Sequence, residues 1–139
     1  MLRIVAVIVT AAALSCEARP GAGEARRAFA AGGSMAIDLP GGTLARHAPG
    51  VSTFTLDPGV RAPRQIEIAE RDPGTPQRPL RLRELPGGSG GDEFELRGAL
   101  RRCGAVVEVR CSQQSEMGRP SFDWCRRALA SLRCRPSGD

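Results

Sequence analysis

Four of the five cysteines of the chain lie near its C-terminal end, at Cys103, Cys111, Cys125 and Cys134. Paired as two disulfides, they would fix how the last segments of the chain pack together. This constraint matters because the chain has few large side chains for a core: four Phe, one Trp and no Tyr. Small domains with modest cores are commonly stabilised by such cross-links. The sequence therefore predicts a disulfide framework.

Geometry narrows the three possible pairings of these four cysteines. Cys125 and Cys134 on one helix would be about 13 Å apart at 1.5 Å per residue, and Cys103 and Cys111 bracket an extended run of about 26 Å at 3.3 Å per residue. Both separations exceed the roughly 7 Å between Cα atoms that a disulfide permits. A helix that doubles back across the last strand predicts Cys111–Cys125 and Cys103–Cys134. The second bond then needs a tilted helix or a cysteine beyond the helix end. The crossed pairing needs a helix parallel to the strand, for which residues 112–120 form a short connection.

A structural zinc site is the alternative use of the four thiols. The spacings within each pair are Cys-x₇-Cys and Cys-x₈-Cys, whereas zinc sites usually contain Cys-x₂₋₄-Cys knuckles. We therefore expect disulfides and no metal.

Period-two alternation of apolar residues dominates the chain before its last segment. In residues 105–111, Val107, Val109 and Cys111 share one face, which is typical of a strand. Similar runs bounded by Pro and Gly predict strands at 35–39, 51–56, 65–69, 80–85 and 93–100. The last segment instead has apolar residues at helical spacing, and Ser121 precedes it as an N-cap. The predicted fold class is α+β, a mainly antiparallel sheet with a C-terminal helix joined to it by the two disulfides.

The N-terminus has the parts of a secretory signal, namely Arg3, an apolar run over 4–14 and small residues beyond. The run is shorter than the roughly 20 apolar residues that a membrane-spanning helix needs. Its end, Ala13-Leu14-Ser15-Cys16, resembles the lipobox of bacterial lipoproteins, in which signal peptidase II cuts before a cysteine that becomes acylated. The resemblance implies that Cys16 is lipidated and that membrane lipid anchors the mature chain.

Two further expectations concern the subcellular location of the mature chain. Glu17 follows the cysteine where an Asp often marks retention at the inner membrane, so the resemblance implies the outer membrane, with the protein facing the periplasm. Cleavage after Ser15 or Ala18 is the alternative, and it gives a soluble periplasmic or secreted protein.

The composition predicts four segments. Residues 1–15 form the signal peptide, 16–33 the lipidated cysteine and a flexible tether, 34–136 a single small α+β domain, and 137–139 a disordered tail. The tether is expected because residues 17–33 are mostly small or charged and bury little apolar surface.

The 20 basic residues are all arginine and give a net charge of +5. They are interspersed with acids, as in Arg81-Leu82-Arg83-Glu84, and base-stacking aromatics are scarce. The charge therefore predicts a modest attraction to anionic surfaces and no nucleic-acid partner.

Candidate catalytic residues are few, and no cofactor is predicted. His47, the single histidine, has no adjacent set that would make it a general base, so we expect an exposed turn histidine. Asp92, Glu93 and Glu95 could bind calcium, but we expect them to form a solvated strand edge. Trp124 lies off the main apolar stripe of the helix. It is either an anchor at the border of the core or an exposed contact for a protein partner.

The mature domain also resembles small PsbP-like envelope lipoproteins, in the segment Ile37-Asp38-Leu39-Pro40-Gly41, the run of strands and the terminal helix around residues 128–133. This resemblance implies a curved antiparallel sheet with helical cover and a binding or assembly role.

Three functions follow from these features. The leading one is a lipid-anchored, non-enzymatic module that binds another envelope protein. The alternative is an immunity-type or inhibitor lipoprotein that neutralises a periplasmic toxin or hydrolase. The third is an enzyme that depends on His47.

Overall fold

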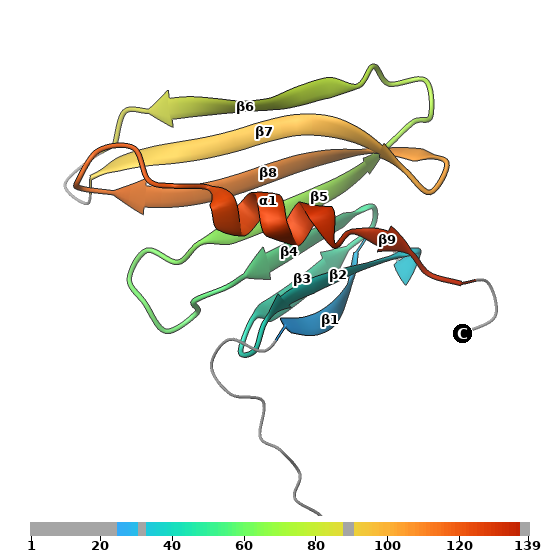
Figure 1. Cartoon of the computed structure of the whole chain (residues 1–139), viewed down its shortest axis with the longest axis horizontal. Coiled ribbons are helices and arrows are strands. Elements are labelled where there is room, and N and C mark those ends of the chain that lie inside the picture. The colour runs from blue at the N-terminus through green and yellow to red at the C-terminus, as the bar shows by residue number, and fades with distance from the viewer. Residues whose placement is uncertain (1–24, 31–32, 88–90, 137–139) are drawn as a thin grey trace, which may run out of the picture.

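A computed structural model describes residues 33–87 and 91–136, together with the backbone of residues 25–30 (Figure 1). The predicted signal peptide, Cys16 and the C-terminal tail lie outside the described residues. In the part of the chain that is described, no helix is long and apolar enough to cross a membrane.

A six-stranded antiparallel sheet forms one layer of the fold, in the order β3-β4-β5-β8-β7-β6. Two three-stranded meanders build it, and they join where β5 pairs with β8 from Gln65↔Ser112 to Arg71↔Val106. The strands are β3 (Leu44–Ala48), β4 (Val51–Thr55), β5 (Gln65–Arg71), β6 (Arg78–Leu85), β7 (Asp92–Arg102) and β8 (Ala105–Ser115).

The second layer contains helix α1 (Asp123–Ala130) and a three-stranded sheet in the order β1-β2-β9. Its strands are β1 (Ala25–Ala30), β2 (Met35–Pro40) and β9 (Arg133–Cys134). Figure 1 shows α1 lying across one face of the large sheet, in front of β5 and β8. We call this covered face the inner face and the opposite one the outer face.

The hydrophobic core lies between the two layers. The alternation predicted in the strands supplies it, because the inner-face residues Ile66, Ile68, Val107 and Val109 are all fully buried. The second layer contributes Met35, Ile37 and Leu39 from β2 and Phe122, Cys125, Ala128, Leu129 and Leu132 from the helical segment. The predicted α+β class is confirmed.

Helix α1 begins one residue later than predicted, at Asp123, and ends earlier than its apolar stripe predicted, at Ala130. Its N-cap is Phe122, which makes no side-chain capping bond, while the Ser121 hydroxyl accepts a 3.3 Å hydrogen bond from the Asp123 N–H. At the other end, the Ser131 hydroxyl donates to the Ala128 carbonyl and accepts from the Asp38 N–H of β2. The chain then pairs with β2 as β9. Tertiary hydrogen bonds to β2 therefore replace the last predicted turn of the helix.

Both predicted disulfides are present. Cys111 and Cys125, with Cα atoms 6.2 Å apart, join β8 to α1 and are fully buried. Cys103 and Cys134, 5.5 Å apart, are exposed. Cys134 lies beyond the helix end, as the second bond required.

A two-residue hairpin places Cys103 at the tip between β7 and β8, because Arg102 pairs with Ala105. Both loop residues have positive φ, 55° at Cys103 and 73° at Gly104. Such two-residue loops match the twist of the strands that they connect. The exposed disulfide therefore joins the tip of the large sheet to the small sheet.

Strand β1 differs from the predicted tether. It pairs along its whole length with β2, from Ala25↔Pro40 to Ala30↔Met35. Composition argued against order in this segment, but strand pairing needs backbone N–H and C=O groups more than large apolar side chains. The remainder of the predicted tether lies outside the described residues, apart from Gly33.

Removing either disulfide should destabilise the domain. On the chain-entropy model, the 14-residue and 31-residue separations correspond to about 3 and about 4 kcal/mol. We expect Cys111→Ala/Cys125→Ala and Cys103→Ala/Cys134→Ala each to lower Tm by roughly 10 °C or more. Thermal unfolding under oxidising conditions measures this. If both double variants melted at the same temperature as the unmodified protein, the disulfides would not be a stabilising framework.

Candidate functional site

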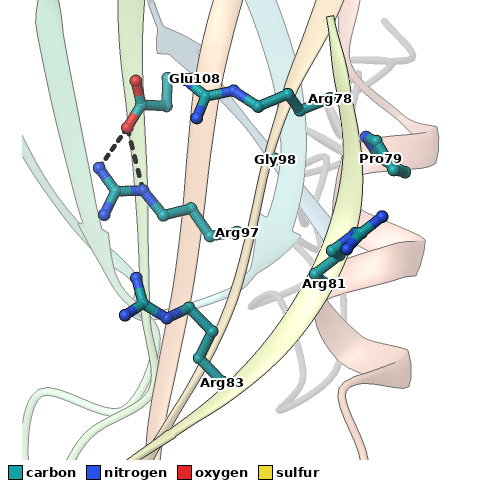
Figure 2. Close-up of a pocket in the computed structure, with 7 residues that line it drawn as sticks. All are labelled: Arg78, Pro79, Arg81, Arg83, Arg97, Gly98 and Glu108. Atoms are coloured by element: carbon teal, nitrogen blue, oxygen red, sulfur yellow. Dashed lines mark hydrogen bonds and ion pairs between the residues drawn. The ribbon is translucent and has the colours of Figure 1, made fainter.

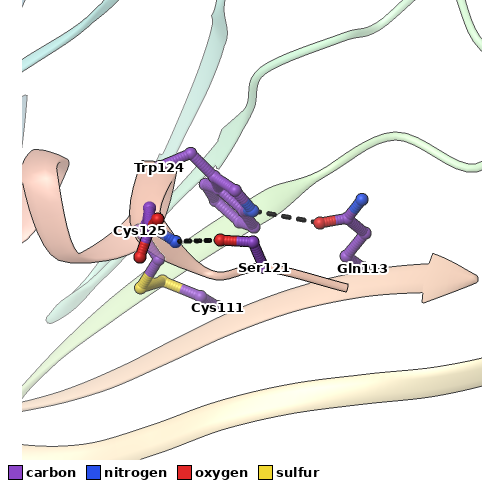
Figure 3. The surroundings of a disulfide bond; sticks show 6 residues. Cys111, Gln113, Ser121, Trp124 and Cys125 are labelled. Carbon is purple, nitrogen blue, oxygen red and sulfur yellow. Dashed lines mark hydrogen bonds between the residues drawn. A yellow bond between two sulfur atoms is a disulfide. The ribbon is translucent and has the colours of Figure 1, made fainter. Parts of the chain in front are cut away.

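Trp124 is partly buried at the border of the core, and neighbouring side chains contact both its indole N–H and its aromatic ring. Its indole N–H donates to the Gln113 side-chain oxygen at 3.0 Å (Figure 3). Its ring lies 5.6 Å from that of Phe122, and the Arg64 guanidinium lies 5.2 Å from the ring centroid. This is the geometry of the core-border anchor.

Arg64 is itself fixed by an ion pair with Asp57, in which Nε lies 2.6 Å from Oδ2. The hydrogen bond from Arg64 lowers the pKa of Asp57, and the same bond raises the pKa of Arg64. The cation beside Trp124 is therefore held in place from the β4–β5 loop. A hollow of about 290 Å³ adjoins the indole. The role of Trp124 as a partner contact stays a prediction.

His47 lies on the edge strand β3, not in the expected turn. Its Nδ1 is 2.9 Å from the Ser52 hydroxyl, and its ring packs edge-on to Phe54 at 6.0 Å. A histidine beside a serine is the arrangement of an activated nucleophile. Ser52, however, is fully buried, so no substrate can reach its hydroxyl in this fold, and the pair is a structural cross-strand contact.

The predicted solvated edge at Asp92, Glu93 and Glu95 is wrong for Glu95. Strand β7 lies inside the sheet between β6 and β8, and Glu95 is only 4 % exposed. Its Oε1 has no hydrogen-bond partner but lies 3.8 Å from the Arg97 guanidinium. The described residues contain no group of three His, Cys, Asp or Glu that could hold a metal ion.

The outer face of the large sheet carries a cluster of arginines that sequence reasoning missed. Strand register brings them together, because Arg81 pairs with Arg97 and Arg97 pairs with Arg110. Arg78 and Arg83 project onto the same face from β6. The alternation of Arg81 and Arg83 within a predicted strand was the available signal. In the sequence alone the same arginines are only interspersed charge, because local pattern does not identify the strand that lies beside them.

Glu108 is the carboxylate at the centre of this face. It accepts hydrogen bonds from Arg97, whose Nε lies 3.0 Å away, and from Arg71, whose Nε lies 3.3 Å away. The bond from Arg97 lowers the pKa of Glu108 and raises that of Arg97. Similarly, Arg110 pairs with Glu67 at 2.9 Å. These acids are therefore already neutralised within the sheet.

Arg78, Arg81 and Arg83 are exposed and, among the described residues, their guanidinium groups make no hydrogen bond or ion pair. We call these three the β6 arginines. With Arg97, Gly98, Pro79 and Glu108 they line a hollow of about 350 Å³. Figure 2 shows Arg78, Arg83 and Arg97 reaching across β7 and β8, while Arg81 leans outward past the sheet edge.

Gly98 gives the hollow its shape. The pairing of β6 with β7 shifts between Arg78 and Arg81, and a Cβ at Gly98 would lie 3.0 Å from the Arg78 carbonyl oxygen and the Leu80 nitrogen. The irregular strand therefore approaches β7 closely at this residue. Chemically, three guanidinium groups without partners beside a recess form a site for carboxylates or other oxyanions, which arginine binds in bidentate fashion.

The fold and this surface define a small, disulfide-linked α+β domain whose distinguishing feature is an arginine-rich outer face. A family model described as the type six secretion immunity 3 (Tsi3) domain matches residues 36–133, most of the chain from β2 to β9. The chain belongs to this family. The search of curated proteins found no match.

A crystal structure from Bacteroides thetaiotaomicron VPI-5482 shares the fold, with a TM-score of 0.52 at 12 % sequence identity. The match covers 84 % of this chain and 50 % of that one, so the chain spans about half the length of that protein. This likeness concerns the fold alone.

The lowered pKa of Glu108 predicts a pH-dependent contribution to stability. Because the folded-state pKa lies below the ordinary 4.5, the contribution is complete above that value and is lost as pH falls through the lowered pKa. We expect Glu108→Gln to destabilise the domain by at most about 1 kcal/mol at pH 7, since exposed arginines supply the pairing. The gap to the unmodified protein should close at acid pH.

Urea unfolding between pH 2 and pH 7 measures this difference. Glu70→Gln is the matched control, since Glu70 is exposed and has no ion pair in the part of the chain that is described. A Glu108→Gln deficit that stayed constant with pH would show that the loss comes from packing, not from the charge.

Proposed function

We propose that this protein is an immunity protein that binds and neutralises a toxin effector of type six secretion in the periplasm. The observation that carries the proposal is the match of residues 36–133 to the type six secretion immunity 3 domain. This was the alternative function expected from the sequence. The match favours it over the broader expectation of a module that binds another envelope component.

A binding function is also consistent with the chemistry of the described residues. The one histidine contacts a serine that no substrate can reach. The surface carries exposed arginines beside a recess, which is suited to recognition. We therefore propose inhibition by physical association, without catalysis by this chain.

The disulfides support a location outside the cytoplasm, because such bonds persist in oxidising compartments. We propose further that Cys16 carries the lipid and that the outer membrane holds the mature chain on its periplasmic side. Lipidation would concentrate the protein where an incoming effector acts. A soluble periplasmic protein is the alternative, and it leaves the inhibitory function unchanged.

Loss of the gene should make cells sensitive to the effector that parental cells deliver. We expect a deletion strain to be killed in mixed culture by parental cells that deliver the effector, and expression of the full chain to restore survival. Counting survivors of each strain measures this. Attackers with an inactive secretion apparatus are the control. Equal survival of the deletion strain beside active and inactive attackers would contradict the proposal.

Anchoring can be tested separately with Cys16→Ala. We expect mass spectrometry of the mature protein to find acyl chains on Cys16, and Cys16→Ala to leave the membrane fraction for the soluble periplasm. A mature chain that lacks Cys16, or that carries it as a free thiol, would establish the soluble alternative.

A further inference from the structure

We infer that the β6 arginines, with the hollow beside Arg97, form the surface that receives the effector, and that the complementary surface of the effector is a rim or cleft rich in carboxylates. This inference rests on the proposed immunity function, and it names the face used and the chemistry of the partner.

The local charge balance around the hollow favours an acidic partner. Glu108 already accepts bonds from two arginines, and Glu67 is paired with Arg110. Around the hollow, four arginines face this single carboxylate. Arg78, Arg81 and Arg83 make no ion pair among the described residues, and Glu95, which lies opposite Arg83, is buried and ion-paired with Arg97 at 3.8 Å. Carboxylates on a partner would supply the missing charge, and each guanidinium can hold one through two parallel hydrogen bonds.

The shape of the surface favours a protein over a lipid bilayer. A recess of about 350 Å³ lies between the edge strand and Arg97, and a protruding acidic side chain or loop can enter it. A planar layer of headgroups would contact the exposed guanidinium groups but leave the recess unfilled. A family of immunity domains also points to a protein partner.

Strand β6 is an edge strand, and an edge strand can bind a partner by pairing with one of the partner's strands. Two features of β6 oppose that mode. Pro79 lacks a backbone N–H, and the register shift between Arg78 and Arg81 interrupts the regular edge. Recognition on β6 therefore depends on side chains. Side-chain charges also accelerate encounter, and this effect weakens as salt is raised.

The test compares two triple variants that change net charge equally. The test variant is Arg78→Glu/Arg81→Glu/Arg83→Glu. The control is Arg46→Glu/Arg61→Glu/Arg126→Glu, which places the same changes on β3, the β4–β5 loop and α1. All six arginines are exposed and make no ion pair among the described residues. Equal melting temperatures establish that both variants fold.

Each full-length variant is expressed in the deletion strain and challenged with attackers that deliver the effector. We expect the unmodified chain and the control variant to protect, and the test variant to fail. With the effector purified from the attacking strain, the test variant should raise Kd by about 10- to 100-fold. The control should stay within a few fold, and Arg78→Lys/Arg81→Lys/Arg83→Lys, which keeps the charge, should fall between them.

The possible results separate the two proposals. If the unmodified chain itself gives no protection, the immunity function fails, and this docking surface fails with it. If all variants protect and bind equally, the function stands and the β6 surface is wrong. Vesicles of phosphatidylglycerol and phosphatidylcholine provide the third arm. If the test variant loses vesicle binding but keeps protection and effector affinity, the arginines contact membrane lipid, and the inference is overturned.

Discussion

The disulfide between Cys111 and Cys125 is the constraint on which the rest of the structure depends. Cys111 lies in β8, the strand that joins the two meanders of the large sheet by pairing with β5, and Cys125 lies in helix α1. The bond therefore fixes the second layer to the centre of the first. With α1 held there, the chain after Ser131 returns along β2, where Cys134 meets the hairpin tip at Cys103. One buried bond and one exposed bond thus fix the helix at both ends.

Much of this arrangement could be predicted from local pattern. Alternation located most strands because each has one face in the core and one in solvent. The cysteine pairing followed from the reach of a helix and of a strand. The strands that were missed have no clear apolar alternation of their own. Strand β1 forms by pairing with the adjacent β2, β3 is an exposed edge strand that pairs with the adjacent β4, and β9 pairs with β2 from the other end of the chain. Only the pairing of β9 depends on a partner distant in sequence.

The candidate site divides in the same way. Trp124 is the single tryptophan, and the structure places it at the border of the core, which is one of the two positions that its offset from the helix stripe left open. The arginine cluster could not be recognised, because Arg97 lies opposite Arg81 only through the register of β6 against β7. Glu95 was misjudged for the same reason, since its burial depends on strands on both sides. Residue type is visible in a sequence, whereas shared position across strands is not.

The position of the β6 arginines follows from the two-layer design. The inner face of the sheet is occupied by α1 and the small sheet, so a partner that engages the large sheet has the outer face available, and this face must be polar to stay in water.

A polar face alone does not imply binding, and the pairs at Glu67 and Glu108 are what solvated strands normally show. The β6 arginines differ because like charges on neighbouring strands repel unless acids separate them, and the acids Glu67 and Glu108 on this face are already paired with Arg110, Arg97 and Arg71. That repulsion is small while water and salt screen it. Contact with an acidic surface would exclude water and convert the same charges into pairs, so charge that is uncompensated in the free protein would be neutralised in the proposed complex.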